Sequence, residues 1–207
     1  MQQPSTDLFK EKAGEWDTRP RAQQLSQAIG DAILDAVPLA ADMRVMDFGA
    51  GTGLIAGRIA PRVASIAAVD VSPAMLAQLA AKAELADKVE TVCQDITSQP
   101  LDRRFDLIAS AMALHHVADT ELLLQRFAEH LEPGGMIALA DLDEEDGSFH
   151  EPGTEGVHHH GFDRDTLHRL LEGAGFGAIA FRTVHTLVKD DGRAYPLFLV
   201  TASKRTG

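Results

Sequence analysis

Apolar positions follow two different spacings along the chain, and each spacing predicts a different kind of element. Between residues 21 and 37 they recur at three- and four-residue steps, which is typical of an amphipathic helix that stops at Pro38. Short apolar runs at residues 43–48 and 65–69 predict buried strands. A helix is expected between these strands, over residues 52–60, because Pro61 ends that stretch. The stretch before Pro20 has weak periodicity and predicts an extended arm or a short helix.

The alternation of helix and strand continues to the end of the sequence. Further helices are predicted over residues 72–85, 120–131 and 163–174, with Ser72 as an N-cap and Pro133-Gly134-Gly135 as a stop signal. Further strands are predicted at residues 89–93, 105–109, 136–140, 178–187 and 195–202, and the last two form a hairpin. Strands that alternate with helices form a parallel sheet covered on both faces. The sequence thus predicts a three-layer α/β sandwich whose mostly parallel, seven-stranded sheet has an antiparallel C-terminal edge hairpin.

One stretch, residues 141–162, has neither a helical nor a strand period. Loops of this length are uncommon in compact domains and are usually functional or mobile. Because it follows the fifth predicted strand at the edge where a ligand would bind, we interpret it as a lid. The rest of the chain divides into an N-terminal arm and helix (1–38), a core (43–140) and a C-terminal helix and hairpin (163–207), all within a single domain.

Composition and charge narrow the classes of function. A chain of 207 residues, 45% of them hydrophobic, suits one globular domain. The formal net charge of −12 argues against a nucleic-acid partner, because binding a phosphate backbone needs a basic surface. No apolar run reaches the roughly 18 residues of a membrane-spanning helix, and residues 1–17 are too polar for a signal peptide. Cys93 is the only cysteine, so no internal disulfide can form and a cytoplasmic location is expected.

The strongest chemical signal is a glycine-rich turn directly after the first predicted strand. Gly49, Gly51 and Gly53 alternate there with small residues, and Asp47 precedes them. In an open parallel sheet a ligand binds at this edge, and side chains at these positions would hold it away from the backbone. On the glycines alone, an ordinary connection between strand and helix remains the alternative.

A second acid favours the ligand-binding interpretation. Asp70 ends the next predicted strand about 20 residues further on, where an acid can accept hydrogen bonds from both hydroxyls of a ribose. A dinucleotide fingerprint requires glycine at its sixth position, but Leu54 stands there. The carboxylate of Asp47 is also a poor neighbour for a pyrophosphate, and it suits a sulfonium or an amine. These residues predict a positively charged ligand that carries an adenosine-like ribose.

Five motifs stand in order along residues 43–140. They are Asp47-Phe48-Gly49-Ala50-Gly51-Thr52-Gly53, Ala68-Val69-Asp70-Val71-Ser72-Pro73-Ala74-Met75-Leu76, Gln94-Asp95-Ile96, Phe105-Asp106-Leu107-Ile108 with Leu114-His115-His116-Val117, and Leu131-Glu132-Pro133-Gly134-Gly135. Together they resemble the class I S-adenosylmethionine-dependent methyltransferases, in particular a small-molecule, quinone-biosynthesis-like group. The resemblance implies a Rossmann-like fold, S-adenosylmethionine as the cofactor and a small-molecule acceptor. Phe48 and Ala50 replace the family's frequent aliphatic and cysteine residues, which leaves the cofactor prediction unchanged.

The resemblance also implies roles for single residues. The glycine turn would pass beside the methionine part of the cofactor, and Asp70 would hold the ribose hydroxyls. Asp95 would accept a hydrogen bond from the adenine amino group near the backbone of Ile96, and Ser110 and Ala111 would line the path to the methyl group. The cofactor-binding residues implied in this way are Asp47, Gly49, Ala50, Gly51, Gly53, Asp70, Val71, Asp95, Ile96, Ser110 and Ala111.

Histidines supply further candidate groups. His115 and His116 follow the fourth strand, where either could act as a base or orient the acceptor; the alternative is a turn that only caps the strand. The adjacent residues His158, His159 and His160 cannot all converge on one ion from a strand, so no metal site is predicted.

Several alternatives stay open at this point. Trp16 either covers the cofactor or anchors the arm. An NAD-type oxidoreductase and a non-catalytic S-adenosylmethionine-binding protein are the alternative functions. The acceptor atom and the oligomeric state are not defined by the sequence.

Overall fold

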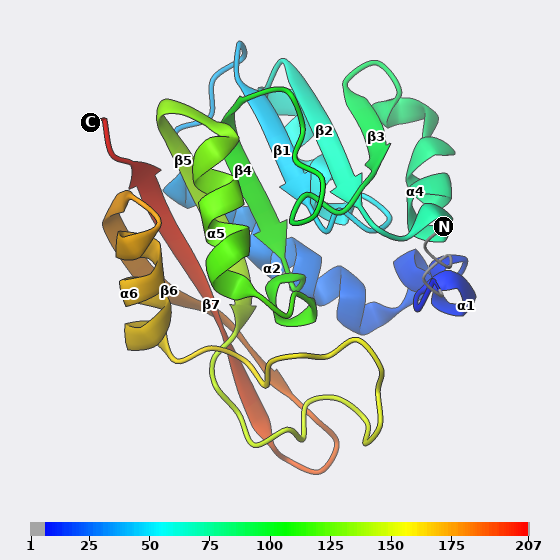
Figure 1. Ribbon diagram of the computed structural model, residues 1–207. Helices are drawn as coiled ribbons and strands as arrows, with labels where there is room; N and C mark the ends of the chain where they lie inside the picture. Colours follow the sequence, from blue (N-terminus) through cyan, green and yellow to red (C-terminus); the bar gives the residue numbers. More distant parts are fainter. Residues whose placement is uncertain (1–6, 207) are drawn as a thin grey trace.

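The computed structural model describes residues 7–206, and at its centre lies a seven-stranded sheet (Figure 1). The strands lie in the order β3-β2-β1-β4-β5-β7-β6. β1 to β5 are parallel to one another, whereas β7 runs antiparallel to both β5 and β6. The strands are β1 (Arg44–Phe48), β2 (Ser65–Asp70), β3 (Val89–Cys93), β4 (Phe105–Ala111), β5 (Leu131–Leu142), β6 (Phe176–Val188) and β7 (Ala194–Lys204). The predicted mostly parallel sheet with an antiparallel edge hairpin is confirmed.

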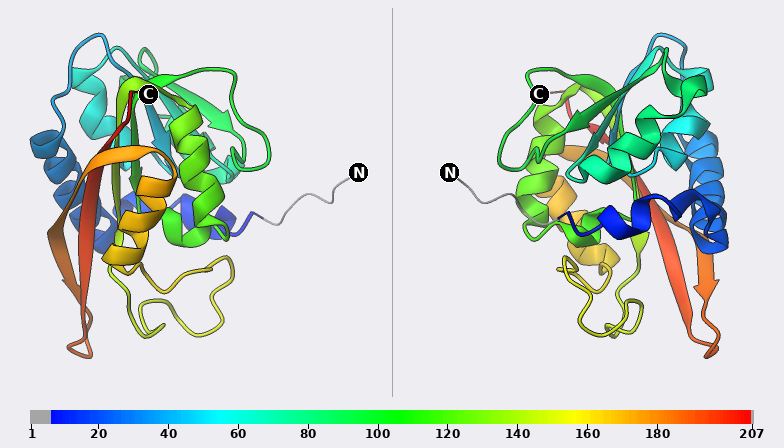
Figure 2. Two further views of the ribbon diagram at one scale, coloured as in Figure 1. Left: turned by 60° about the vertical axis from the view of Figure 1, so that its left-hand side comes forward. Right: turned by 90° about the vertical axis from the view of Figure 1, so that its right-hand side faces the viewer.

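Helices cover both faces of this sheet (Figure 2). They are α1 (Lys10–Ala13), α2 (Pro20–Ala36), α3 (Leu54–Ile59), α4 (Pro73–Ala80), α5 (Thr120–Glu129) and α6 (Arg164–Gly173), with short 3-10 turns η1 (Trp16–Thr18), η2 (Ala60–Arg62), η3 (Ala83–Leu85) and η4 (Leu114–His116). Among the helices described over residues 7–206, none is both long enough and apolar enough to cross a membrane. Residues 1–6 of the predicted arm, which include part of the stretch judged for a signal peptide, lie outside the described residues.

The two faces of the sheet contribute to two separate hydrophobic clusters. Successive strand residues point to opposite faces, so Val45 packs in one cluster with Ile33 of α2, and Met46 packs in the other with Phe127 of α5. α6 joins the second cluster through Leu167. This alternation is the physical basis of the three layers, because each helix buries its apolar stripe against one face.

The helix predicted over residues 120–131 is present as α5, but its predicted end at a proline–glycine stop is wrong. α5 ends at Glu129, and Leu131 already pairs with Phe105 as the first residue of β5. Pro133 and Gly134 lie inside this strand, where the pairing with β4 shifts register and Gly134 has a φ of 78°. A β-bulge accommodates such residues within a strand, so the signal that predicted a stop marks an irregularity in the sheet.

The helix predicted over residues 72–85 also ends early, at Ala80. Its N-cap is as expected, because the hydroxyl of Ser72 accepts a hydrogen bond from the amide of Met75. At its other end Lys82 adopts an extended conformation and donates to the carbonyl of Thr52 at 2.7 Å. This tertiary contact overrides the helical preference of the alanine-rich sequence.

The predicted lid over residues 141–162 begins two residues too early. Asp141 and Leu142 belong to β5, where they pair with Phe198 and Leu197 of β7. Residues 143–162 contain no helix or strand and form one isolated bridge, between Asp143 and Phe162. Phe162 is 8% exposed and packs against Phe198, so it anchors the end of the segment in the core.

Candidate functional site

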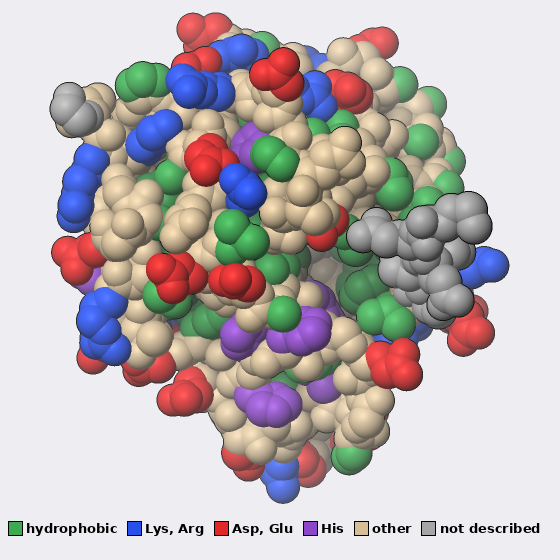
Figure 3. All heavy atoms as spheres, in the orientation of Figure 1, with side chains coloured by type: hydrophobic (Ala, Val, Ile, Leu, Met, Phe, Trp, Pro, Cys, Tyr) green, Lys and Arg blue, Asp and Glu red, His purple; other side chains and the backbone are tan. Residues whose placement is uncertain are grey.

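A cavity of about 1480 Å³ lies at the carboxyl ends of β1, β2 and β4. Its walls come from the glycine turn, the N-terminal arm, α2, η4, the segment 143–162 and the loop between β6 and β7. Figure 3 shows histidine side chains gathered on this face of the molecule. Sites for one small ligand usually enclose about 300–1,000 Å³, so this cavity has room for two ligands side by side.

The glycine turn forms the floor of the cavity through unusual backbone angles. Gly49, Gly51 and Gly53 have φ values of 66°, 54° and 81°, a region that side chains disfavour. A Cβ atom on Gly49 would lie 2.2 Å from the Cβ of Ala113, whereas a Cβ on Gly51 would meet no atom within 4 Å. Gly49 therefore permits close packing against the loop that follows β4, and Gly51 leaves its backbone open to the cavity.

Asp47 is a buried acid that faces this cavity without a complete set of partners. It is 1% exposed, and its Oδ2 atom has no hydrogen-bond partner within residues 7–206. Burial, with a smaller contribution from the charge of Asp70, raises the pKa of Asp47 to about 7. A buried acid is stabilised as an anion by a cation placed next to it. The site thus fits a ligand with a positive charge at this point, as a sulfonium or an ammonium group would provide.

Asp70 lies at the end of β2 and connects two turns. Its Oδ2 accepts a hydrogen bond from the amide of Gly51 at 2.7 Å, and its Oδ1 accepts one from the amide of Ser72 at 2.8 Å. Burial raises the pKa of Asp70 despite these bonds. Because each carboxylate oxygen can accept two hydrogen bonds, Asp70 keeps capacity for two ligand hydroxyls. Val71, which follows it, is 61% exposed and also lines the cavity.

Asp95 lies at the rim of the cavity after β3. Its carboxylate accepts hydrogen bonds from the amide and hydroxyl of Thr97 and from the hydroxyl of Ser98. Partial burial works to raise its pKa, but these hydrogen bonds outweigh it and hold the pKa below the ordinary value. Asp95 is therefore an oriented, charged acceptor at the end of the cavity nearest β3.

Eight of the eleven predicted cofactor-binding residues line one cavity and three lie behind it. Ile96 is fully buried in the hydrophobic core, and Gly53 packs under Leu79. The hydroxyl of Ser110 donates to the carbonyl of Phe48 at 2.9 Å, which connects β4 to β1. Gly53 and the side chains of Ile96 and Ser110 therefore pack within the protein interior. The eight that line the cavity are Asp47, Gly49, Ala50, Gly51, Asp70, Val71, Asp95 and Ala111.

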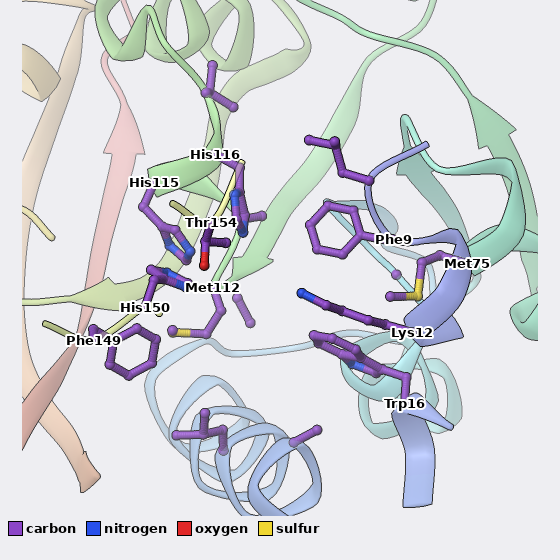
Figure 4. Close-up of a pocket in the computed structure, with 18 of the residues that line it drawn as sticks. Phe9, Lys12, Trp16, Met75, Met112, His115, His116, Phe149, His150 and Thr154 are labelled. Carbon is purple, nitrogen blue, oxygen red and sulfur yellow. The ribbon is translucent and has the colours of Figure 1, made fainter. Parts of the chain in front are cut away.

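His115 and His116 lie on η4 and line the cavity (Figure 4), and the ring of His116 contacts Phe9 of the arm edge-on, with the ring centroids 5.4 Å apart. His115 is 1% exposed, and its Nδ1 lies 2.7 Å from Oδ1 of Asp141. The Nδ1 atom of His116 lies 2.7 Å from the carbonyl oxygen of Gly156 and therefore donates to it. Burial, followed by the neighbouring His115, lowers the pKa of His116 to about 4. His116 is thus a neutral ring at physiological pH.

Sequence reasoning did not assign Asp141 and His150 to this site. His150 comes from the segment 143–162, and its ring centroid lies 5.1 Å from that of His115. Asp141 ends β5 beside β4, so its position directly after an apolar strand was the available signal, because neighbouring parallel strands end at the same edge. His150 could not be placed in this way, because it lies in an irregular segment.

The N-terminal arm supplies another wall of the cavity. Phe9, Lys12 and Trp16 point into the cavity from this side (Figure 4). Trp16 also contacts Phe9 edge-on at 6.4 Å and lies under the guanidinium of Arg19. Asp17 fixes the arm to the glycine turn, since it accepts a hydrogen bond from the hydroxyl of Thr52 at 2.5 Å. Both open interpretations of Trp16, a cavity wall and an anchor of the arm, are compatible with these contacts.

The consecutive histidines of the segment 143–162 point to different neighbours. The amide of His158 donates to the carbonyl of His115, and the ring of His159 lies 2.9 Å from the carbonyl oxygen of Val117. The ring of His160 lies 3.7 Å from Glu145. Over residues 7–206, no group of three His, Cys, Asp or Glu side chains is arranged to hold a metal ion.

Comparison with known proteins identifies the family of this chain. A family model described as a methyltransferase domain matches residues 21–181, which is most of the chain. The chain belongs to this family. The match supports the resemblance to class I S-adenosylmethionine-dependent methyltransferases that the glycine turn and Asp70 indicated. It does not favour the alternative of an NAD-type oxidoreductase.

Curated relatives match part of this methyltransferase domain. An uncharacterized methyltransferase of Mycobacterium tuberculosis is 33% identical over 109 residues, which cover 53% of this chain and 55% of the relative. The ubiquinone biosynthesis O-methyltransferase of Nitrobacter winogradskyi is 34% identical over 110 residues, which cover 53% of this chain and 42% of that enzyme. The chain thus spans about half the length of these relatives.

Solved structures share the fold at low sequence identity. A methyltransferase-like protein of Haloferax volcanii, solved in complex with the Trm112 methyltransferase activator, has a TM-score of 0.82 at 18% identity, with 97% of each chain covered. The N-methyltransferase NodS of Bradyrhizobium japonicum, solved with S-adenosyl-L-homocysteine, has a TM-score of 0.71 at 14% identity, covering 97% of this chain and 95% of NodS. Together they confirm a Rossmann-like methyltransferase fold.

Proposed function

We propose that the chain binds S-adenosylmethionine in the cavity and transfers its methyl group to a small-molecule acceptor in the cytoplasm. The observation that carries this proposal is the buried carboxylate of Asp47, a residue of the cavity lining at the glycine turn whose Oδ2 has no hydrogen-bond partner within residues 7–206. A cationic group satisfies such an acid, whereas a pyrophosphate would be repelled by it. This feature favours a sulfonium cofactor over a dinucleotide.

The residues that line the cavity divide into a cofactor half and an acceptor half. Asp70 and Asp95 would hold the ribose and the adenine at the β2 and β3 end, with the open backbone of Gly51 beside the methionine part. His115 and His116 would face the acceptor on the opposite side, beyond Ala111. Gly53, Ile96 and Ser110 would support this arrangement from behind through packing and the bond to Phe48.

A small molecule is the acceptor class that the cavity suits. Its volume of about 1480 Å³ leaves room beside a cofactor for one further ligand. The rim also carries acidic groups, among them Glu151 and Asp191, and the formal net charge is −12. Repulsion from such a surface disfavours a polyanionic nucleic acid as the acceptor.

Calorimetric titration of the purified protein with S-adenosylmethionine, S-adenosylhomocysteine and NADH tests this proposal. We expect both S-adenosyl ligands to bind at micromolar affinity, about −8 kcal/mol, and NADH to give no saturable heat. Asp70→Ala should weaken S-adenosylmethionine binding by roughly 1–3 kcal/mol, since charge-assisted hydrogen bonds to the ribose are lost. Asp102→Asn, at an exposed position away from the cavity, serves as the matched acidic control.

Two results would contradict the proposal. Saturable NADH binding without binding of S-adenosylmethionine would favour an oxidoreductase. Unchanged affinity in Asp70→Ala would remove that residue from the site. Transfer of a labelled methyl group from S-adenosylmethionine into a mixture of metabolites then separates an enzyme from a protein that only binds the cofactor.

A further inference from the structure

Asp141 is fully buried and accepts three hydrogen bonds, two of which come from His115. Its Oδ1 lies 2.7 Å from Nδ1 of the His115 ring, and its Oδ2 accepts from the His115 backbone amide at 3.2 Å. The third comes from the amide of Leu142 at 2.8 Å. Because a carboxylate can only accept, the shared proton is on Nδ1 of His115. When that is the only ring proton, Nε2 carries a lone pair.

The position of His115 is fixed from several directions. Asp141 is held in β5, whose residues 136–142 pair with β7. The carbonyl of His115 accepts hydrogen bonds from the amides of His158 and His159, which hold η4 against the segment 143–162. No hydrogen bond to Nε2 of His115 occurs among the described residues, and this side chain lines the cavity. Its free lone pair is therefore available to a ligand there.

His150 adds a second polar atom beside His115. Its Nε2 atom is buried and has no hydrogen-bond partner within the described chain. Burial, followed by the proximity of His115 and His116, lowers the pKa of His150 to about 4, so the ring is neutral near pH 7. Figure 4 shows His115 and His150 side by side, with Met112 and Phe149 next to them. A buried nitrogen without a partner costs free energy that a polar group of a ligand would recover.

We propose that Asp141 is a positioning residue that holds His115 as a general base, and that the methyl acceptor is a hydroxyl compound with a second polar group that reaches His150. The proposal rests on the proposed function. A neutral amine already has a lone pair and needs no strong base, whereas a hydroxyl gains nucleophilicity when its proton is removed during attack. A buried Asp–His pair would therefore assist the methylation of a hydroxyl group, whereas the methylation of an amine would not require it.

The proposed step balances with S-adenosylmethionine as the methyl donor. The acceptor O–H bond breaks and its proton moves to Nε2 of His115, while the acceptor oxygen forms a bond to the methyl carbon. The bond between that carbon and sulfur breaks with its electron pair on sulfur, which leaves S-adenosylhomocysteine. The positive charge that develops on His115 is balanced by Asp141, and the proton is later released to solvent.

The tautomer of His115 provides a test that requires no acceptor. Long-range nitrogen–proton NMR spectra of the labelled full chain distinguish a ring protonated at Nδ1 from one protonated at Nε2, and His115→Gln assigns the signals. We expect the Nδ1-protonated form in the wild type and a shift towards the other form in Asp141→Asn, with no change in Asp102→Asn. A wild-type His115 ring protonated at Nε2 would overturn the proposal, even if Asp141→Asn failed to fold.

Matched acceptors test the chemistry. Pairs of phenols and anilines with the same carbon skeleton, including catechols, are incubated with S-adenosylmethionine. We expect methylated phenols only, and a kcat at least about 100-fold lower in Asp141→Asn and His115→Gln. His168→Gln, at a half-buried position on α6 outside the cavity, serves as the control. Methylated anilines with unchanged kcat in Asp141→Asn would overturn the proposal. If no pair reacts, the NMR measurement of the His115 tautomer decides whether the proposal stands.

Calorimetry separates failure of this inference from failure of the proposed function. Asp141→Asn should bind S-adenosylmethionine within about three-fold of the wild type, because Asp141 does not line the cavity. Absence of S-adenosylmethionine binding by the wild type would contradict the function itself. Normal binding together with the wrong tautomer would contradict only the role of Asp141.

Discussion

At the scale of single residues, the two acids Asp47 and Asp70 have different environments. Asp70 accepts backbone hydrogen bonds from both turns that flank it, whereas Asp47 retains an oxygen without a partner within residues 7–206. The sequence pattern was sufficient to place both at one edge of the sheet, because each is among the last two residues of a parallel strand, β1 or β2. Asp141 also lies near the end of a parallel strand. Its proposed role, however, depends on its contact with the ring of His115, and no spacing within the sequence predicts that contact.

The raised pKa of Asp47 predicts opposite effects of Asp47→Asn on stability and on cofactor affinity. An acid whose pKa is higher in the folded protein binds its proton more tightly when folded, so ionisation destabilises the fold as pH rises from about 3.9 to about 7. Above that range Asp47→Asn should raise the free energy of unfolding, by roughly 4 kcal/mol at most. Near pH ~4 the two proteins should differ little.

Urea unfolding of the ligand-free protein over a series of pH values checks this prediction, and Asp102→Asn controls for the loss of one acid. The same variant should bind S-adenosylmethionine more weakly at neutral pH, since an amide cannot neutralise a cation. A stability difference that is independent of pH would mean that Asp47 has an ordinary pKa in the fold.

At the scale of elements, the sequence identified every strand and the longer helices, because their apolar periods are set by burial against one sheet. It failed where tertiary contacts decide the outcome. Pro133 and Gly134 looked like the end of a helix but occupy a bulge in β5, and Lys82 leaves α4 to reach Thr52. The segment 143–162 has no period because backbone bonds to η4, rather than a repeating face, hold it in place.

Shortening the segment 143–162 tests its proposed role as a lid. Replacing residues 151–157 with a short glycine linker removes the carbonyl of Gly156 that accepts from His116, along with the cavity wall formed by Glu151 and Thr154. We expect S-adenosylmethionine affinity within a few-fold of the wild type, while turnover of the acceptor collapses, because lids exclude water and position substrates.

Calorimetry and a methyl-transfer assay on the same preparation measure the two quantities separately. A linker of equal composition inserted after Asp102, at an exposed position that does not line the cavity, provides a control for added flexibility. Equal losses of cofactor binding and turnover would show that the segment supports the cofactor pocket and does not act as a lid.

At the scale of the whole molecule, one edge of the sheet brings together acidic groups from several strands. The parallel strands bring Asp47, Asp70 and Asp141 to the same end, although they are far apart in the sequence. The alternating order of elements predicted this architecture. It could not predict that the arm and the segment 143–162 meet over the cavity, where Leu8 lies so close to Gly156 that a Cβ there would be 2.5 Å from it.

The net charge of −12 predicts the response of the intact protein to nucleic acids. We expect no retardation of duplex DNA or of transfer RNA in gel-shift experiments at physiological salt, because association with a phosphate backbone depends on cationic side chains that displace counterions. Charge-reversed variants of exposed acids provide the positive control. Binding of the unmodified protein that weakens steeply with added salt would contradict the expectation and reopen the question of the acceptor.

The position of Trp16 gives the protein an internal optical reporter. It is the only tryptophan of the chain, it is half-buried in the wall of the cavity, and its indole already contacts Phe9 and Arg19. Selective excitation of indole would therefore report on one defined place, without labels or background from other parts of the chain. Emission from this single fluorophore is sensitive to the polarity of its surroundings, so filling of the cavity and movement of the arm would both register as changes in intensity or colour.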